Sequence, residues 1–246
     1  FVMSLFAQYH SQARALTREA ALRALSGNLC RCTGYRPIVE AACHMHAAPP
    51  ARLQESRLLQ KLKQIAENSR PPQVDGAYLL PTNLPALLAA RRRHPGAQLV
   101  AGCTDVGLWI TKQHRQFAAI IDLTRVRDLR RVETYPHHIA IGAAVTLEDA
   151  YAALVAERPQ LAEFAHRFAG LPVRNAGTMG GNIANGSPIG DSMPLLIALG
   201  AQVILMREDR QGRVRHRHVA VEALYTGYRQ NVMRADEVLA WVVVPR

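Results

Sequence analysis

The residues from Arg174 to Asp191 combine glycine, asparagine, threonine and serine in a stretch that has few bulky side chains. Glycine lets the backbone adopt positive φ angles and lets another group approach the main chain closely. Asparagine, threonine and serine supply short hydrogen-bond donors and acceptors. We therefore predict that this run forms neither a helix nor a buried strand and lines a large polar ligand. The apolar segment 193–205 would anchor it to a core.

A second ligand-binding loop is predicted upstream of this run. Leu99–Ala101 has the pattern of a short buried strand, Gly102–Gly107 that of a tight loop, and residues 108–112 that of the start of a helix. Such a unit directs free backbone N–H groups toward one point, which suits a phosphate. The loop has neither the G-x-G-x-x-G pattern of a Rossmann unit nor the Lys-Ser/Thr ending of a P-loop. Taken alone, a glycine turn of this kind is more often an ordinary loop.

Two of the four cysteines, Cys30 and Cys32, lie one residue apart in the segment Gly27–Ile38. Thiolates are the usual ligands of iron–sulfur clusters, four to each [2Fe–2S] centre. A disulfide between the two is unfavourable, because a single intervening residue gives poor geometry. A C-x-C pair in an arbitrary protein is more often structural or incidental. Gly34 and Pro37, which interrupt a helix near the sulfurs and leave amides free to donate to a cluster, favour Cys30 and Cys32 as metal ligands. The other two cysteines do not fit the pattern.

The N-terminal part of the chain has a helical pattern. Apolar residues recur at helical spacing over 4–9 and 14–25, where Thr17 is a candidate cap, and a third helix is predicted over 37–46. We place a first domain at residues 1–47 and a linker at residues 48–75. The linker contains Pro49-Pro50, Pro71-Pro72 and, between them, a short amphipathic helix at 53–67.

Residues 76–246 form a second domain with mixed helical and strand patterns. Thr82 or Asn83 is suited to cap the first helix, and Gln211-Gly212 is typical of a hairpin turn. The helices are predicted at 83–94, 147–158 and 160–168. The strands are predicted at 99–101, 118–122, 139–142, 202–207 and 238–244.

The two glycine-containing loops, in this order and spacing, resemble the FAD-binding domain of the molybdenum hydroxylases, the xanthine dehydrogenase group. The resemblance covers about residues 78–246 and is carried by Gly177–Ile183 and Ser187–Asp191. The segment Gly27–Ile38 is similar to the second cysteine pair of the helical [2Fe–2S] domain in the same enzymes. The resemblance implies an α+β fold class: the C-terminal part of an all-helical [2Fe–2S] domain, then a vanillyl-alcohol-oxidase-type (PCMH-type) FAD-binding domain.

The resemblance also implies that this chain contains only part of the family's iron–sulfur and flavin region. In the family, a first cysteine pair precedes the segment around Cys30, and a further flavin subdomain follows the last strand. We therefore expect the chain to be a fragment without the N-terminal ferredoxin-like part and the C-terminal flavin subdomain. An iron–sulfur domain followed by a flavin domain resembles the small subunit of the two-subunit bacterial xanthine dehydrogenases.

The family pattern assigns roles in FAD binding to particular residues. Phe168 and Ala169 would lie beside the isoalloxazine, Asp191 would accept hydrogen bonds from the cofactor, and Leu239 would pack on the flavin or adenine. Phe168 as a core aromatic and Asp191 as a helix N-cap are the structural alternatives. The residues expected around the pyrophosphate and its neighbouring ribose are Leu99, Val100, Ala101, Gly102, Cys103, Thr104, Asp105, Val106 and Gly107. The rest of FAD would be lined by Thr178, Gly181, Asn182, Ala184 and Asn185.

The chemistry implied by the resemblance belongs to cofactors. A molybdenum-binding large subunit would oxidise hypoxanthine or xanthine, and electrons would pass through [2Fe–2S] clusters to FAD and on to NAD⁺. We predict no catalytic residue in this chain, and an assembly that is a heterotetramer or larger. One alternative is the iron–sulfur/flavin subunit of another molybdenum hydroxylase, acting on an aldehyde or N-heterocycle. The other is a non-catalytic flavin-binding fragment.

Composition and sequence patterns also indicate which other functions are not expected of this chain. The formal net charge is +11, but the arginines are scattered and match no nucleic-acid-binding motif, so no nucleic-acid partner is expected. No apolar run reaches the roughly 20 residues that span a bilayer, so no membrane association is expected. The ten histidines occur singly or in pairs without a third ligand at metal spacing. The few cysteines and the absence of a secretory pattern predict a cytoplasmic protein.

Overall fold

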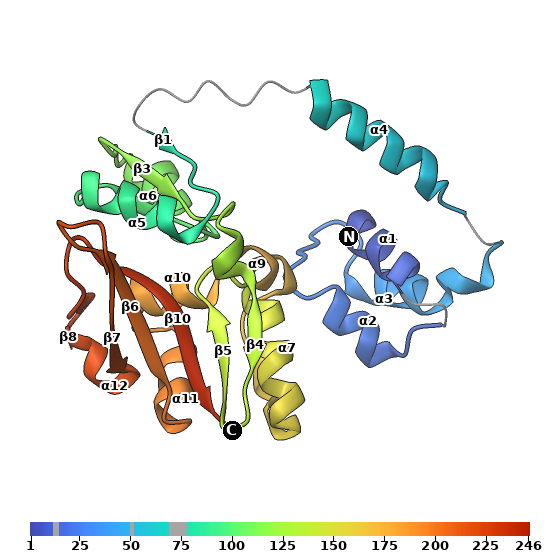
Figure 1. The fold of residues 1–246 in the computed structure, drawn as a ribbon. Coiled ribbons are helices and arrows are strands. Elements are labelled where there is room, and N and C mark those ends of the chain that lie inside the picture. Colours follow the sequence, from blue (N-terminus) through green and yellow to red (C-terminus); the bar gives the residue numbers. More distant parts are fainter. Residues whose placement is uncertain (12–14, 50–51, 69–77) are drawn as a thin grey trace. The chain divides into compact units, whose positions relative to one another are not determined.

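The computed structural model describes residues 1–11, 15–49, 52–68 and 78–246 (Figure 1). The chain divides into two compact units, Phe1–Asp75 and Gly76–Arg246. The predicted helix start at Arg14 and the linker prolines at 50, 71 and 72 lie outside the described residues.

The first unit is helical. Leu16, Ala21 and Leu25 form a small core with Val39 and Ala42. Its elements are α1 (Val2–Ser11), α2 (Arg18–Ala24), α3 (Tyr35–His44), a 3₁₀ turn (Met45–Ala47) and α4 (Glu55–Asn68). The helical pattern predicted for this part of the chain is confirmed.

Local signals explain where the helices of the first unit begin. The Thr17 side chain accepts a hydrogen bond from the Ala20 amide at 3.2 Å, which confirms the predicted cap of α2. Helix α3 begins at Tyr35, two residues before the predicted start. The prediction was wrong there because Pro37 is accommodated in the first turn, where its missing N–H costs no helical hydrogen bond.

The second unit contains two sheets and the helices around them, so the predicted α+β class is confirmed. A parallel three-stranded sheet has the order β1-β3-β2, and a five-stranded sheet has the order β4-β5-β10-β6-β7. The strands are β1 (Tyr78–Leu79), β2 (Gln98–Val100), β3 (Ile120–Asp122), β4 (Val132–Thr134), β5 (His138–Gly142), β6 (Gln202–Glu208), β7 (Val214–Ala220), β8 (Tyr225–Gly227), β9 (Gln230–Asn231) and β10 (Val238–Pro245).

The helices of the second unit lie between these strands in the chain. The Asn83 side chain caps the first of them by accepting from the Ala86 amide at 2.9 Å, as predicted. The helices are α5 (Leu84–Arg93), α6 (Val106–Gln113), α7 (Leu147–Glu157), α8 (Ala162–Arg167), α9 (Leu171–Ala176), α10 (Met179–Asn185), α11 (Ser192–Ala198) and α12 (Val221–Leu224), with 3₁₀ turns at Arg127–Arg130 and Pro159–Leu161.

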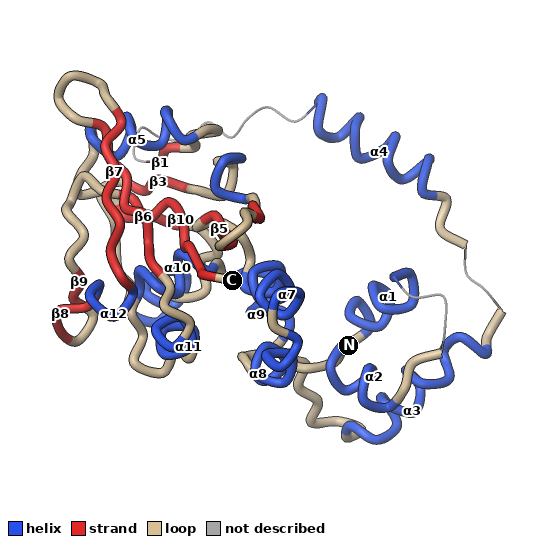
Figure 2. The backbone as a smooth tube through the Cα atoms, turned by 60° about the horizontal axis from the view of Figure 1, so that its bottom comes forward, coloured by secondary structure: helices blue, strands red, loops and turns tan. Residues whose placement is uncertain are grey.

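The main core lies between the five-stranded sheet and the helices on one of its faces. Ile141, Leu205 and Val242, from three adjacent strands, are 0–1% exposed and pack with Met179 and Ile183 of α10. Figures 1 and 2 show α10 and α11 along this face. A second core joins α5 to the parallel sheet and to the other face of β10. One face of β10 therefore packs in the main core, and its other face packs in the core beneath the parallel sheet.

The run 174–191 is partly helical, so our prediction that it forms no helix was wrong. Helix α10 contains two glycines, each of which costs about 1 kcal/mol relative to alanine. Met179 and Ile183 are completely buried, and each contributes roughly 1.5–3 kcal/mol. The Thr178 cap adds to this stabilisation. Tertiary packing therefore outweighs the poor helix propensity of the segment.

Candidate cofactor site

The two predicted loops line one cavity of about 380 Å³ in the second unit. One wall comes from the end of β2 and the turn into α6, and the opposite wall comes from the start of α10. Such a volume lies in the range of small-molecule and cofactor sites. Of the residues expected to bind FAD, the lining includes Leu99, Val100, Ala101, Gly102, Cys103, Thr104, Asp105, Val106, Thr178, Gly181, Asn182, Ala184, Asn185 and Leu239.

Gly102 determines how closely the two loops approach. A Cβ atom at this position would lie 2.0 Å from the Ala176 carbonyl oxygen and 2.7 Å from the Gly177 Cα. Only glycine allows this backbone contact. The next residue, Cys103, has a φ of +58°, a left-handed conformation that is uncommon for a side chain of this kind. The turn after β2 is therefore shaped by its contact with the α9–α10 junction.

The start of α10 forms the opposite wall of the cavity. The Thr178 hydroxyl accepts a hydrogen bond from the Gly181 amide at 3.1 Å. Both glycines line the cavity, but an added Cβ at Gly180 would lie 2.4 Å from that of Ala143 in the core, whereas one at Gly181 would meet only the Thr178 hydroxyl. The two glycines therefore have different roles: one allows helix packing and the other keeps the cavity wall flat.

Three polar atoms on lining residues are buried and have no hydrogen-bond partner among the described residues. They are Asn182 Oδ1, Asn185 Nδ2 and Arg91 Nε. Buried polar groups are almost always satisfied, so each points to a missing partner. A dinucleotide carries many hydrogen-bond donors and acceptors on its phosphates, its riboses and its rings. The flat wall at Gly181 and these unpaired atoms fit FAD.

Four of the predicted FAD-binding residues are outside the cavity lining: Gly107, Phe168, Ala169 and Asp191. Phe168 contacts the main core, and the centroid of its ring lies 5.2 Å from the centroid of the Tyr151 ring. Asp191 is exposed and precedes α11, where its side chain makes no capping hydrogen bond. Asp191 thus occupies the N-cap position that the structural alternative predicted, but without a side-chain capping hydrogen bond.

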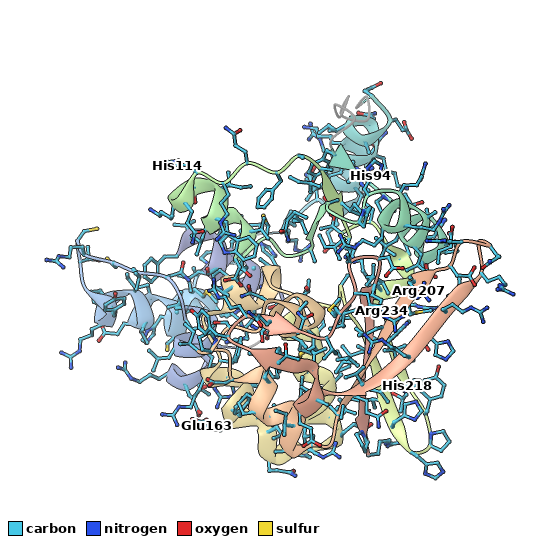
Figure 3. The ribbon with its side chains drawn as sticks, turned by 90° about the vertical axis from the view of Figure 1, so that its left-hand side faces the viewer. His94, His114, Glu163, Arg207, His218 and Arg234 are labelled. Carbon is cyan, nitrogen blue, oxygen red and sulfur yellow. The ribbon has the colours of Figure 1, made fainter. Side chains whose placement is uncertain are left out.

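The cavity also has lining residues that the sequence analysis did not identify. Asn231 donates to the Ala184 carbonyl at 3.4 Å and so joins the segment before β10 to α10. Figure 3 labels Arg234, also on this segment, and Arg207 of β6 donates to Asp236 of the same segment at 3.2 Å. No periodicity or motif marks these positions, which reach the cavity only through the tertiary fold. The other unpredicted lining residues include Arg91, Trp109, Leu123, Met233, Ala235 and Val238.

An ion pair between a buried carboxylate, Glu237, and the half-buried Arg217 holds the start of β10 beside the cavity. Glu237 is 2% exposed and accepts two hydrogen bonds from Arg217, each at 2.8 Å, and one from the Arg234 amide. Burial alone would raise the pKa of Glu237. The hydrogen bonds from Arg217 and the Arg234 amide, with the charges of the two arginines, instead hold that pKa below its ordinary value.

We expect Glu237→Gln to destabilise the second unit by about 2 kcal/mol near neutral pH, because it leaves Arg217 without its charged partner. A depressed carboxyl pKa stabilises the fold above the unfolded pKa of about 4.3, and this contribution is lost as the pH falls through the folded pKa. The stability difference between the two proteins should therefore be constant from pH 6 to 8 and vanish in acid. Urea unfolding at several pH values measures it, with the exposed Glu222→Gln as control. A difference independent of pH would contradict the assignment.

In the first unit, Cys30 and Cys32 lie in the loop before α3. Both are free thiols, their sulfurs are 3.9 Å apart, and the Cys30 sulfur lies 3.5 Å from the Thr33 hydroxyl. The Thr33 side-chain hydrogen bond, together with backbone hydrogen bonds, lowers the pKa of Cys30 to about 6. A thiolate is the form that binds metal. The pair offers two thiols, whereas a [2Fe–2S] cluster takes four ligands.

Two family models match the chain. The FAD binding domain in molybdopterin dehydrogenase matches residues 72–246, and a [2Fe-2S] binding domain matches residues 1–43. The chain therefore belongs to the molybdenum hydroxylases, as part of their iron–sulfur and FAD-binding region. FAD and [2Fe–2S] are the cofactors of these two domains, as the resemblance implies.

Relatives and solved structures agree with this assignment. The chain is 32% identical over 292 residues to a xanthine dehydrogenase of Drosophila pseudoobscura pseudoobscura, with 97% of this chain but 22% of the relative covered. Carbon monoxide dehydrogenase from Hydrogenophaga pseudoflava matches 72% of this chain and 60% of its own with a TM-score of 0.61 and 28% identity. Quinoline 2-oxidoreductase from Pseudomonas putida 86 shares the fold, with a TM-score of 0.62, 23% identity, and coverage of 70% of this chain and 59% of its own.

The matched proteins are oxidoreductases, and the chain spans about a fifth of the length of the curated relatives it matches. None of the helices in the described ranges is both long enough and apolar enough to cross a membrane. Within the same ranges, no group of three or more histidine, cysteine or acidic side chains is placed to hold a metal ion.

Proposed function

We propose that the cavity of the second unit binds FAD between the turn after β2 and the start of α10. The observation that carries the proposal is the joint lining of one cavity by two loops 70 or more residues apart, with unpaired polar atoms at Asn182, Asn185 and Arg91. When bound, FAD supplies two-electron redox chemistry. The chain's own residues bind the cofactor, orient it and exclude water from it.

Each wall has a distinct part in this proposal. Main-chain N–H groups of Gly102–Val106 would hold the pyrophosphate, and Asn182 and Asn185 would use their unpaired amide atoms to bind ribose or ring groups. Leu239, buried on β10, would cover an apolar part of the cofactor. Phe168 and Asp191 would reach FAD from outside the present lining, as the family pattern implies.

We further propose that the chain transfers electrons within a larger molybdenum hydroxylase. Cys30 and Cys32 would bind one [2Fe–2S] cluster, a partner subunit would hold the molybdenum cofactor, and NAD⁺ would accept the electrons from the flavin. The similarity to xanthine dehydrogenases at up to 32% identity favours a purine such as xanthine or hypoxanthine. The assembly would be a heterotetramer or larger.

The first experiment is a visible absorption spectrum of the purified chain, followed by heat release and identification of the flavin. We expect about one FAD per chain and no FMN, because the turn after β2, which is suited to a pyrophosphate, lines the cavity together with the start of α10. A protein that releases no flavin and takes up no added FAD would contradict the proposal.

A second candidate is the corresponding subunit of another molybdenum hydroxylase, acting on an aldehyde or N-heterocycle, because the match to a carbon monoxide dehydrogenase at 28% identity shows that proteins similar to this chain are not all xanthine dehydrogenases. Steady-state assays of the complete complex with xanthine, hypoxanthine, an aldehyde and quinoline distinguish the two. Turnover of the last two only would overturn the xanthine dehydrogenase proposal, while leaving the FAD site intact.

A further inference from the structure

Arg174, in the middle of α9, is buried, with a relative exposure of 4%, and no other arginine among the described residues is buried. Its Nε donates to the Glu148 carboxylate at 2.5 Å. Its Nη1 donates to the main-chain carbonyls of Phe168 at 2.8 Å and Ala169 at 3.0 Å, and more distantly to His166 at 3.4 Å. A charged side chain is therefore used to bind the backbone of one short turn.

The turn that Arg174 binds is strained. Ala169 has a φ of +49°, in the left-handed region that residues with a Cβ atom rarely adopt. Such a conformation costs about 1–2 kcal/mol and persists only where surrounding contacts determine it. The two short hydrogen bonds from Arg174 are such contacts. They hold the Phe168 carbonyl, which precedes the strained residue, and the carbonyl of Ala169 itself.

The other end of the Arg174 side chain connects to the cavity wall. Glu148 follows Leu147, which lines the cavity, and the Leu147 amide donates to the Gly177 carbonyl at 2.8 Å. Two residues beyond Arg174, the Ala176 carbonyl is the group against which Gly102 packs. The arginine thus lies at the point where the Phe168–Ala169 turn, α7 and both cavity loops meet.

We propose that Arg174 is a positioning residue, which holds the Phe168–Ala169 turn in a fixed place beside the cofactor cavity through its pair with Glu148. The inference rests on the proposed FAD site. The function requires an arginine rather than any cation, because the planar guanidinium directs donors at a carboxylate and at two carbonyls together. A lysine could satisfy the carboxylate or the turn, but not both in this geometry.

The test uses Arg174→Met, which has similar length and no charge, and Arg174→Lys in the full chain. Arg167→Met is the matched control, because Arg167 is exposed on α8 and lies 3.9 Å from Glu163, which Figure 3 shows at the outer surface. The measurements are FAD dissociation constants, the absorption and fluorescence of the bound flavin, and hydrogen exchange of amides 168–170 in the FAD-free protein. Glu148→Gln provides a second variant in case Arg174→Met does not fold.

We expect Arg174→Met to raise the FAD dissociation constant roughly tenfold, as loss of charged hydrogen bonds predicts. The flavin spectrum should shift and amides 168–170 should exchange faster, with Arg174→Lys intermediate and Arg167→Met unchanged. Glu148→Gln should change the same three readouts in the same direction.

Unchanged FAD affinity, flavin spectrum and exchange in folded Arg174→Met, or in Glu148→Gln if the first variant does not fold, would overturn the inference while the wild-type chain still binds FAD. Faster exchange without any change in FAD affinity or flavin spectrum would show that Arg174 stabilises the turn but does not affect the cofactor. This result would also overturn the inference. Failure of the wild-type chain to bind FAD would instead contradict the proposed function, and would remove the basis of the inference with it.

Discussion

Gly181→Val is expected to abolish FAD binding while leaving the second unit folded. A Cβ atom at this position would lie 2.7 Å from the Thr178 hydroxyl, and the valine methyl groups would occupy the cavity wall. The backbone cost is small, because valine has a better helix propensity than glycine and displacement of the Thr178 cap costs about 1 kcal/mol. Flavin content after purification and calorimetric titration of the FAD-free protein measure the effect.

Two variants separate blocking of the cavity from general damage. Gly96→Val adds the same side chain where no atom lies within 4 Å of the new Cβ, so it should retain full flavin content. Thr178→Ala removes the cap of α10 without filling the cavity, so it should lose stability but retain measurable FAD binding. Normal flavin content in Gly181→Val would show that this wall of the cavity does not contact the cofactor.

Cys30→Ser in the full-length enzyme is expected to remove one [2Fe–2S] cluster, about two iron atoms per chain, and to leave the flavin bound. Cys30 lies in the first unit and the cavity lies in the second, and no residue is shared between the two sites. Electron transfer from the molybdenum site to the flavin should fall by orders of magnitude. Electron paramagnetic resonance of the reduced enzyme, iron content and flavin content provide the measurements.

Cys43→Ser is the matched control for this experiment, because Cys43 is a free cysteine of the same unit, half-buried in α3. It should retain both the iron–sulfur signals and the activity. Retention of every iron–sulfur signal in Cys30→Ser would contradict the assignment of this cysteine as a ligand. Loss of flavin together with the cluster would show that the two units do not hold their cofactors independently.

Local chemistry made much of the fold predictable. Thr17 and Asn83 cap α2 and α5 because a short side-chain oxygen competes well for the first free amides of a helix. The predicted hairpin is present between β6 and β7, where Gly212 adopts a φ of +76°. The runs 202–207 and 238–244 form adjacent strands of one sheet. Each of these signals acts over a few residues and needs no knowledge of the rest of the molecule.

Long-range contacts limited the rest of the prediction. Helix α10 has a sequence unfavourable to helices and exists because Met179 and Ile183 are buried by strands far away in the chain. The lining residues around Asn231 and Arg234 carry no motif, and only the tertiary fold places them at the cavity. Residue type alone also gives no sign that Arg174 is buried or that it binds a strained turn.

The amino-acid sequence by itself therefore determined the class of protein, the two cofactor types and the two loops that contain most of the candidate FAD-binding residues. These features depend on residue types at fixed short spacings, which a linear chain displays directly. Only the tertiary structure decided that Gly102 contacts Ala176 and so joins the two loops into one cavity. It also decided which polar atoms there are left unpaired, because burial and hydrogen-bond partners arise only when distant segments pack together.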